Sequence, residues 1–199
     1  LRSLFEGVRV AVIDPEDEYP ALADAVGGTT IRLGMPGVRV NPLDLPTAAS
    51  TRASGTDAVT RRALFVHTLV AVLLGQPPAP EEAAALDTAI AATYARAGIT
   101  DDPATWGRPA PLLADVVACL ESATDPTDQT NTADAAGRTL AVRLRPWTHG
   151  SFKGLFDGPT TTTPGGRLTV WSVRHLPDEL RAAGILLALD AIWRDVDTD

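Results

Sequence analysis

Two kinds of hydrophobic pattern divide the chain. Short and mostly β-branched apolar runs occur near both ends, at Val8–Ile13, Thr29–Leu33 and Arg167–Val173. Runs of this kind are typical of strands in a parallel sheet. A helix is expected over Glu16–Val26, after the first run, and a longer one over Pro177–Asp195. The order strand, helix, strand at the start of the chain predicts an α/β fold.

The middle of the chain carries helical patterns alone. Four segments place apolar residues at helical spacing, with no strand-like run between them. They are Arg61–Leu74, Pro80–Gly98, Leu113–Leu120 and Ala136–Trp147, and they follow a small, polar connector at Thr47–Thr60. We therefore expect three parts: a first α/β part (1–46), an all-helical insert (47–150) and a second α/β part (151–199). An insert of that size is expected to behave as a subdomain.

Composition and charge exclude several classes of protein. The 199 residues carry a formal net charge of -8, which argues against a broad nucleic-acid-binding surface. The only lysine, Lys153, lies between Phe152 and Gly154, so the chain contains no phosphate-binding P-loop of the Walker A type. Three widely separated histidines and one cysteine predict no metal site and no disulfide framework. No apolar stretch is long enough to cross a membrane, and a reducing cytoplasmic location is expected.

The strongest candidates for chemistry are the carboxylates that follow the first expected strand: Asp14, Glu16 and Glu18. Ligands in open α/β sheets bind at the carboxyl ends of strands. Carboxylates there can orient a magnesium-bound water or act as a general base. The alternative is structural, because Asp14 and Glu16 can cap the next helix and interact favourably with its dipole.

Two further features have both a functional and a structural interpretation. Arg138, Arg143 and Arg145 give the fourth insert helix a basic side, which either binds a partner or is simply solvated. The stretch Gly150–Gly158 spaces its glycines four residues apart. It either cradles a phosphate with the help of Lys153 or forms a tight turn between the insert and the sheet.

Several of these segments together resemble a known family. The block Val10–Tyr19 reads V-A-V-I-D-P-E-D-E-Y and is followed by Gly27-Gly28, and Asn41–Asp44 reads N-P-L-D. With Gly150–Gly158 and the strand that begins at Arg167, they resemble the type IV secretion and conjugation ATPases. These are the TraC-like branch of the FtsK–HerA P-loop superfamily. The resemblance spans nearly the whole chain and is strongest at both ends.

The resemblance implies a partial P-loop NTPase sheet of the RecA-like type with a large helical insertion. It implies a parent protein that binds ATP and Mg²⁺ and works as a hexamer at the cytoplasmic face of the inner membrane. The partners of that protein would be other secretion components, and its cargo would be DNA or protein. This chain would begin just after the P-loop helix and stop before the Walker B strand, and so be catalytically incomplete. Asp14, Glu16 and Glu18 would then lie near the nucleotide.

Two alternatives remain at the level of sequence. The chain could be a non-catalytic interaction module, with the helical insert as its docking part. It could also be a fragment of an FtsK-like DNA translocase, which would require a basic pore loop.

Overall fold

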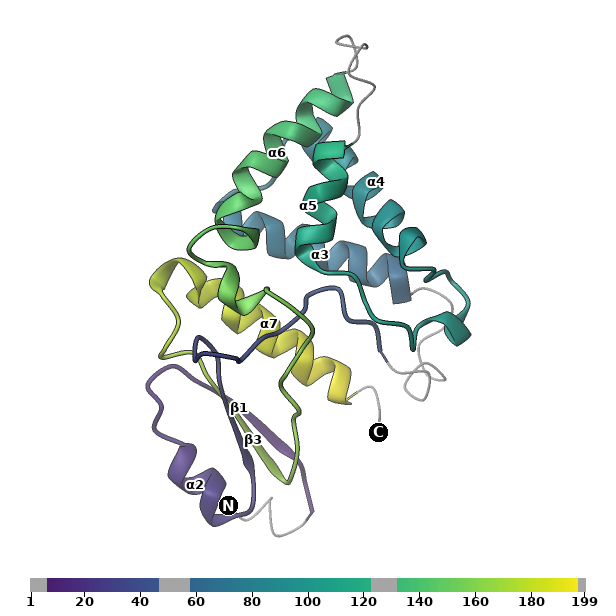
Figure 1. Cartoon of the computed structure of the whole chain (residues 1–199). Coiled ribbons are helices and arrows are strands. Elements are labelled where there is room, and N and C mark those ends of the chain that lie inside the picture. The colour runs from purple at the N-terminus through teal and green to yellow at the C-terminus, as the bar shows by residue number, and fades with distance from the viewer. Residues whose placement is uncertain (1–6, 47–57, 123–131, 197–199) are drawn as a thin grey trace.

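The computed structural model describes residues 7–46, 58–122 and 132–196. A three-stranded parallel sheet lies at one end of the molecule (Figure 1). Its strands are β1 (Val10–Asp14), β2 (Thr29–Arg32) and β3 (Leu168–Ser172), in the order β1-β3-β2. The register aligns Asp14 and Arg32 with Ser172, so the carboxyl ends of all three strands meet at one edge. The expected mixed α/β fold with parallel strands is therefore confirmed.

Each face of the sheet is covered by a helix (Figure 1). The short helix α2 (Pro20–Ala25) buries Ala23 against Leu168 and Val170 of β3. On the other face, α7 (Asp178–Val196) contributes Leu187 and other apolar side chains to the main core. Coverage of both faces explains the apolar run at the start of β1 and the apolar core residues of β3.

Four helices lie between β2 and β3 in the sequence and form a layer beyond α7 (Figure 1). They are α3 (Ala58–Leu74), α4 (Pro80–Arg96), α5 (Leu113–Ser122) and α6 (Thr132–Thr148), with the short 3-10 helices η2 (Pro103–Thr105) and η3 (Lys153–Leu155). Helices α4, α5 and α6 pack on one another, whereas α3 packs on both α4 and α7. A single hydrophobic cluster therefore extends from the sheet into the helices. The connector expected at Thr47–Thr60 lies mostly outside the described residues.

The helix expected over Glu16–Val26 is shorter than predicted. Asp17 has a φ of 60°, a left-handed conformation that interrupts a right-handed helix. The helix begins instead at Pro20, whose fixed φ suits a first helical position. Residues 15–19 therefore form a loop above the carboxyl end of β1, and their side chains are not held on a helix face.

The segment Asn41–Asp44 is the junction between the sheet and the helical layer. Asn41 is buried, and its side-chain amide donates to Asp44 Oδ1 and to the Pro111 carbonyl, both at 3.0 Å. Its side-chain carbonyl accepts a hydrogen bond from Leu43 N at 3.1 Å. One amide thus closes the turn on itself and fixes the chain that enters α5.

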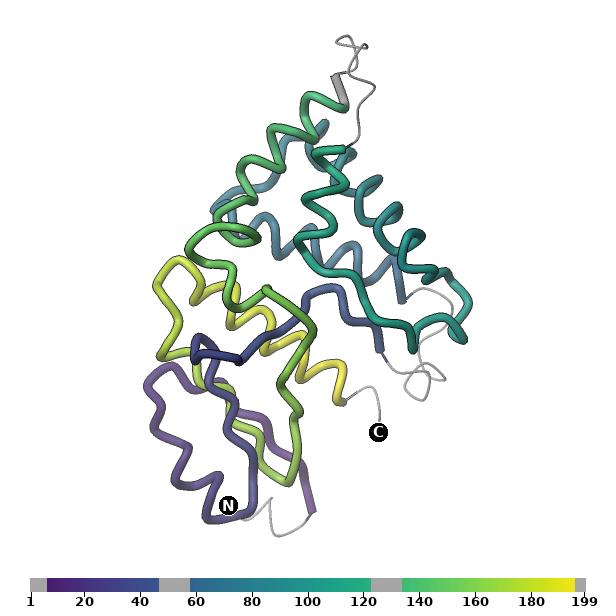
Figure 2. The backbone as a smooth tube through the Cα atoms, in the orientation of Figure 1, coloured from purple at the N-terminus to yellow at the C-terminus, as the bar shows by residue number. Residues whose placement is uncertain are grey.

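Other parts of the chain converge on the same turn. The Tyr94 hydroxyl of α4 donates to the Leu43 carbonyl at 2.7 Å. The Thr160 hydroxyl donates to Asp44 and accepts from Asn41 N. Figure 2 shows the segment that leaves β2 running beside the segment that returns to β3, which includes Thr160. The N-P-L-D sequence therefore joins the two halves of the fold.

Within the described ranges, no helix combines the length and the apolar character needed to cross a lipid bilayer.

Replacement of Asn41 by alanine is expected to destabilise the protein by roughly 2–4 kcal/mol, because it leaves Leu43 N and the Pro111 carbonyl buried without partners. Urea denaturation would measure the change in the free energy of unfolding. Thr88→Ala is the control, because its hydroxyl makes one exposed bond within α4, and a change of about 0.5 kcal/mol or less is expected. Equal effects of the two substitutions would contradict the junction role.

Candidate functional site at the carboxyl edge of the sheet

The first residue of the site, Asp14, ends β1 and is buried. Its carboxylate oxygen Oδ2 accepts a hydrogen bond from Tyr19 N at 2.9 Å. Tyr19 is the N-cap residue of α2, so Asp14 fixes the entry of the chain into that helix. Its main-chain carbonyl accepts from Val173 N at 3.2 Å, which extends the pairing with β3 by one residue. The structural interpretation of Asp14 is therefore supported by direct contacts.

A second carboxylate, Asp17, lies above the same edge and faces the ends of the other two strands. Arg32 Nε at the end of β2 lies 3.5 Å from Asp17 Oδ2. The Ser172 hydroxyl interacts with the Asp17 carboxylate, although too loosely to count as a hydrogen bond of ordinary geometry. This interaction, and then the charge of Arg32, lower the pKa of Asp17 below 3.8, whereas burial opposes the shift. Sequence analysis missed Asp17 as a site residue. The signal that could have found it was its place in the loop directly after a buried strand.

Two polar atoms at this edge are buried without a hydrogen bond. Ser172 is fully buried, and its Oγ makes no hydrogen bond of ordinary geometry with a described residue. The same holds for Asp17 Oδ1. Buried polar atoms are normally hydrogen-bonded, so buried atoms without a partner are uncommon. The two unpaired atoms distinguish this edge of the sheet from the turn at Asn41, where the side-chain amide is fully hydrogen-bonded.

The other two predicted carboxylates, Glu16 and Glu18, are exposed on the loop between β1 and α2. The loop is held from the opposite side, because Arg174 Nη1 donates to the Glu16 carbonyl at 2.7 Å. Asp14 thus ends β1, whereas Glu16 and Glu18 lie on the loop that follows it, and their role near a nucleotide stays a prediction. No group of three or more His, Cys, Asp or Glu side chains that could hold a metal ion occurs among the described residues.

The glycine-spaced stretch Gly150–Gly158 forms a packed turn. Leu155 and Phe156 are buried, and Phe152 stacks on Trp147 with ring centroids 6.5 Å apart. Lys153 Nζ lies 3.4 Å from Asp157 Oδ2, so the only lysine already has an anionic partner. These contacts match the structural interpretation of the stretch.

The three arginines of the predicted basic side lie on α6, away from the sheet edge. Arg143 Nη1 lies 2.6 Å from Glu82 Oε2 of α4, and Arg145 Nη2 lies 2.9 Å from Glu121 Oε1 of α5. Arg138 is exposed. Two of the three thus hold the helical layer together. The role of this surface in binding a partner stays a prediction.

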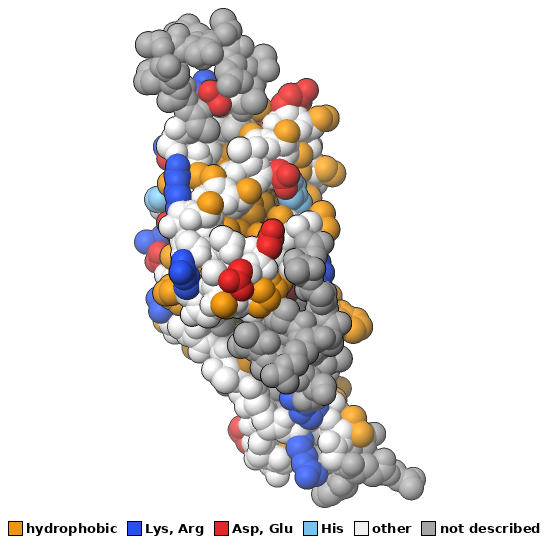
Figure 3. Space-filling model, turned by 90° about the vertical axis from the view of Figure 1, so that its right-hand side faces the viewer, with side chains coloured by type: hydrophobic (Ala, Val, Ile, Leu, Met, Phe, Trp, Pro, Cys, Tyr) orange, Lys and Arg blue, Asp and Glu red, His pale blue; other side chains and the backbone are white. Residues whose placement is uncertain are grey.

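Figure 3 shows one face of the molecule, on which basic and acidic side chains are interspersed.

Sequence analysis missed a largely buried ion-pair cluster between α3 and α7. Asp190 Oδ2 lies 2.8 Å from Arg62 Nη1 and 3.1 Å from Arg194 Nε. Asp190 lies on α7 and is mostly buried. Arg62 also donates to the Pro42 carbonyl at 3.4 Å and lies over the Phe65 ring. Its position within the apolar stripe Ala58–Val66 was the available signal.

Nucleotide binding at this edge stays a prediction. Among the described residues, the cations near the strand edge are Arg32 and Arg174, which contact Asp17 and the Glu16 carbonyl. Asp14 is used by the main chain, and no metal-binding group is present in the same ranges.

Comparison with known proteins gives one clear result. No family model matches the chain, and no curated protein matches it. Among solved structures, VirB4 of Thermoanaerobacter pseudethanolicus superposes with a TM-score of 0.81 at 23% sequence identity. The match covers 100% of this chain and 73% of that chain. The two proteins therefore share a fold over the full length of this chain.

Asp17→Asn tests the electrostatics of the strand edge. Asparagine tolerates the left-handed backbone, so the substitution removes mainly the charge. Because the pKa of Asp17 is lowered in the folded state, its charged form adds stability above the ordinary value of 3.8, and this contribution is lost as pH falls through the lower folded pKa. Wild type is expected to be the more stable at about pH 7, with the difference shrinking below about pH 4.

Chemical denaturation across this pH range would measure the difference in the free energy of unfolding. The exposed Asp101 offers a matched control, and Asp101→Asn should change the free energy of unfolding by about 0.5 kcal/mol or less. A pH-independent difference for Asp17→Asn would show that its charge is not stabilised in the folded state.

Proposed function

We propose that this chain is a segment of a type IV secretion ATPase and is catalytically incomplete alone. The observation that carries the proposal is the superposition on VirB4, a type IV secretion ATPase, over the whole chain. The D-P-E-D-E-Y and N-P-L-D sequences, which pointed to the same family, occupy the strand edge and the junction of this fold. Similarity of fold and similarity of motifs are separate observations and agree.

In this proposal, the segment contributes one edge of the ATP-binding region. Asp14 positions the loop by holding Tyr19 N, and Glu16 and Glu18 on that loop are exposed toward solvent. The phosphates and Mg²⁺ are bound by a P-loop in another part of the parent protein, since Lys153 is not in a Walker A sequence. The parent protein is a hexamer peripheral to the cytoplasmic membrane face, and it powers the transfer of DNA or protein.

An FtsK-like DNA translocase is less well supported. A protein that grips DNA needs cations that neutralise phosphates, and this chain has a net charge of -8. Arg143 and Arg145 of α6 are already paired with carboxylates of the same chain. The charge distribution therefore favours the secretion ATPase.

ATP hydrolysis tests the proposal directly. The purified 199-residue chain is expected to show no hydrolysis above background, whereas a natural polypeptide that adds the P-loop should be active. In that longer polypeptide, Asp14→Asn should lower kcat about tenfold to a hundredfold, because misplacing a loop near the reacting groups is costly. Glu121→Gln, which alters only an exposed pair between α5 and α6, should leave kcat unchanged.

Two results would reject the proposal. One is sustained hydrolysis by the 199-residue chain that Asp14→Asn abolishes, because the chain would then be catalytically complete. The other is a longer natural polypeptide that contains no P-loop and has no ATPase activity.

A further inference from the structure

The last residues of the three strands form a row across one face of the sheet. The register pairs both Asp14 and Arg32 with Ser172. Side chains alternate between the two faces along a strand, and residues paired in register point to the same face. Val12 and Val170, two positions before the ends of β1 and β3, belong to the apolar cluster beneath α2. The row therefore lies on the α2 face of the sheet.

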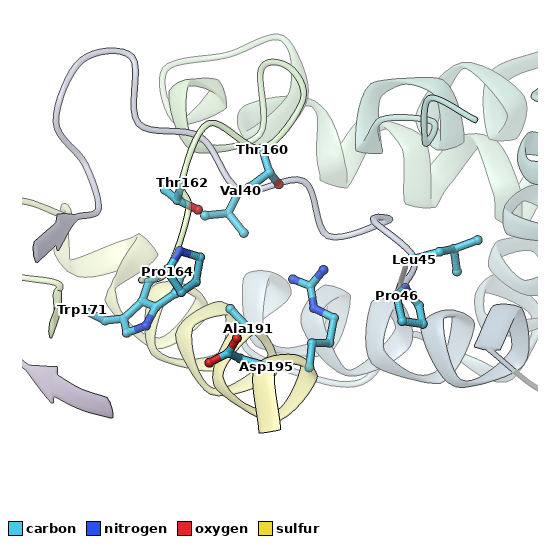
Figure 4. A pocket seen from close by; sticks show the side chains of 10 residues that line it. Val40, Leu45, Pro46, Thr160, Thr162, Pro164, Trp171, Ala191 and Asp195 are labelled. Carbon is cyan, nitrogen blue, oxygen red and sulfur yellow. The ribbon is translucent and has the colours of Figure 1, made fainter. Parts of the chain in front are cut away.

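The side chains just before the row point the other way. Figure 4 shows Trp171 at the wall of a cavity that Ala191 of α7 also lines. Ile31 of β2 belongs to the main core, to which α7 contributes. Trp171 and Ile31 thus face α7, and the residues that follow them, Ser172 and Arg32, face away from α7.

Every member of the row holds the loop formed by residues 15–19. Asp14 Oδ2 accepts a hydrogen bond from Tyr19 N at 2.9 Å, which fixes the end of the loop. Asp17, in the middle of the loop, lies with its Oδ2 3.5 Å from Arg32 Nε, and its carboxylate also interacts with the Ser172 hydroxyl. The loop is therefore attached to the ends of all three strands.

The backbone at Asp17 suits this attachment. Its φ of 60° is a left-handed conformation that aspartate and asparagine adopt more readily than most residues. The Asp17 side chain is 21% exposed, whereas Glu16 and Glu18 on either side of it are exposed. Arg174 Nη1 also donates to the Glu16 carbonyl at 2.7 Å. The loop thus turns one carboxylate toward the sheet and leaves its two neighbours in solvent.

We infer that Asp17 is a positioning residue: held by Arg32 and Ser172, it keeps the loop in the place from which Glu16 and Glu18 act in ATP hydrolysis. The inference rests on the proposed function, which puts this loop at the edge of the ATP-binding region. Carboxylates there can orient a magnesium-bound water or act as a general base. Their efficiency depends on exact placement, so a loosened loop slows the chemical step.

Amide exchange in the 199-residue chain tests the attachment without ATP. Asp17→Asn tolerates the left-handed backbone and removes the charge. We expect Tyr19 N–H to exchange at least about fivefold faster relative to Val170 N–H of β3, because the loop opens locally while the sheet stays folded. Arg181→Gln is the matched control. Its guanidinium pairs with Asp178 within α7 and has an exposure close to that of Arg32, so the ratio should not change.

ATPase kinetics of the longer natural polypeptide test the role in catalysis. Asp17→Asn is expected to lower kcat about tenfold and to leave KM for ATP within about twofold of wild type, because the loop orients reacting groups. Arg32→Gln should have a similar effect. The double variant should be no slower than the slower single variant, since both substitutions break one contact. Arg181→Gln should leave kcat unchanged.

The possible failures can be told apart. Equal acceleration of Tyr19 and Val170 exchange would overturn the inference, because Asp17 would then serve only the stability of the whole fold. An active longer polypeptide whose kcat is unchanged by Asp17→Asn would overturn the inference and leave the proposed function intact. Faster exchange at Tyr19 with a longer polypeptide that hydrolyses no ATP would support the attachment of the loop and reject the proposed function.

Discussion

The hydrogen-bonded turn at Asn41–Asp44 is the interaction on which the rest of the structure depends. The buried side-chain amide of Asn41 closes the turn and holds the chain before α5. The main-chain N–H of Asn41 and the Asp44 carboxylate bind Thr160 on the segment that returns to β3. A buried polar group is costly unless every partner is present, so this turn specifies one arrangement of the parts it joins. The sheet and the helical layer are therefore connected by polar geometry as well as by their shared apolar core.

The ion pairs between α3 and α7 extend this connection. Asp190 accepts a hydrogen bond from Arg62 and forms an ion pair with Arg194. Arg62 also donates to the Pro42 carbonyl in the turn. Burial of Arg194 lowers its pKa, and burial of the Tyr94 phenol raises its pKa. Buried charges rarely add much net stability, but removal of one partner is expensive. The cluster thus fixes the packing of α3 against α7. Because α7 also covers the sheet, this packing sets the position of the helical layer relative to the sheet.

The sequence predicted the helices and strands better than it predicted the contacts of individual side chains. Strands and helices were found because apolar periodicity and proline or glycine boundaries are local signals. The predicted start of the first helix at Glu16 was wrong. Asp17 has a left-handed backbone, so the helix cannot begin before it and begins at Pro20 instead. The pairing of Arg62 with Asp190 joins residues 128 positions apart, and no local pattern reports such a contact. The assignment of Asp14 to the site stays a prediction, and its hydrogen bond with Tyr19 N depends on the folded loop, which no local pattern reports.

Native-state hydrogen exchange in low denaturant would test most directly whether the Asn41 turn makes the sheet and the helical layer one cooperative unit. The account predicts that slowly exchanging amides of α5, such as Val117, and of β3, such as Val170, report the same free energy of opening, and that Asn41→Ala lowers both by the same amount. Loss of protection in α5 with unchanged protection in β3 would contradict it, because the two parts would then be independently stable.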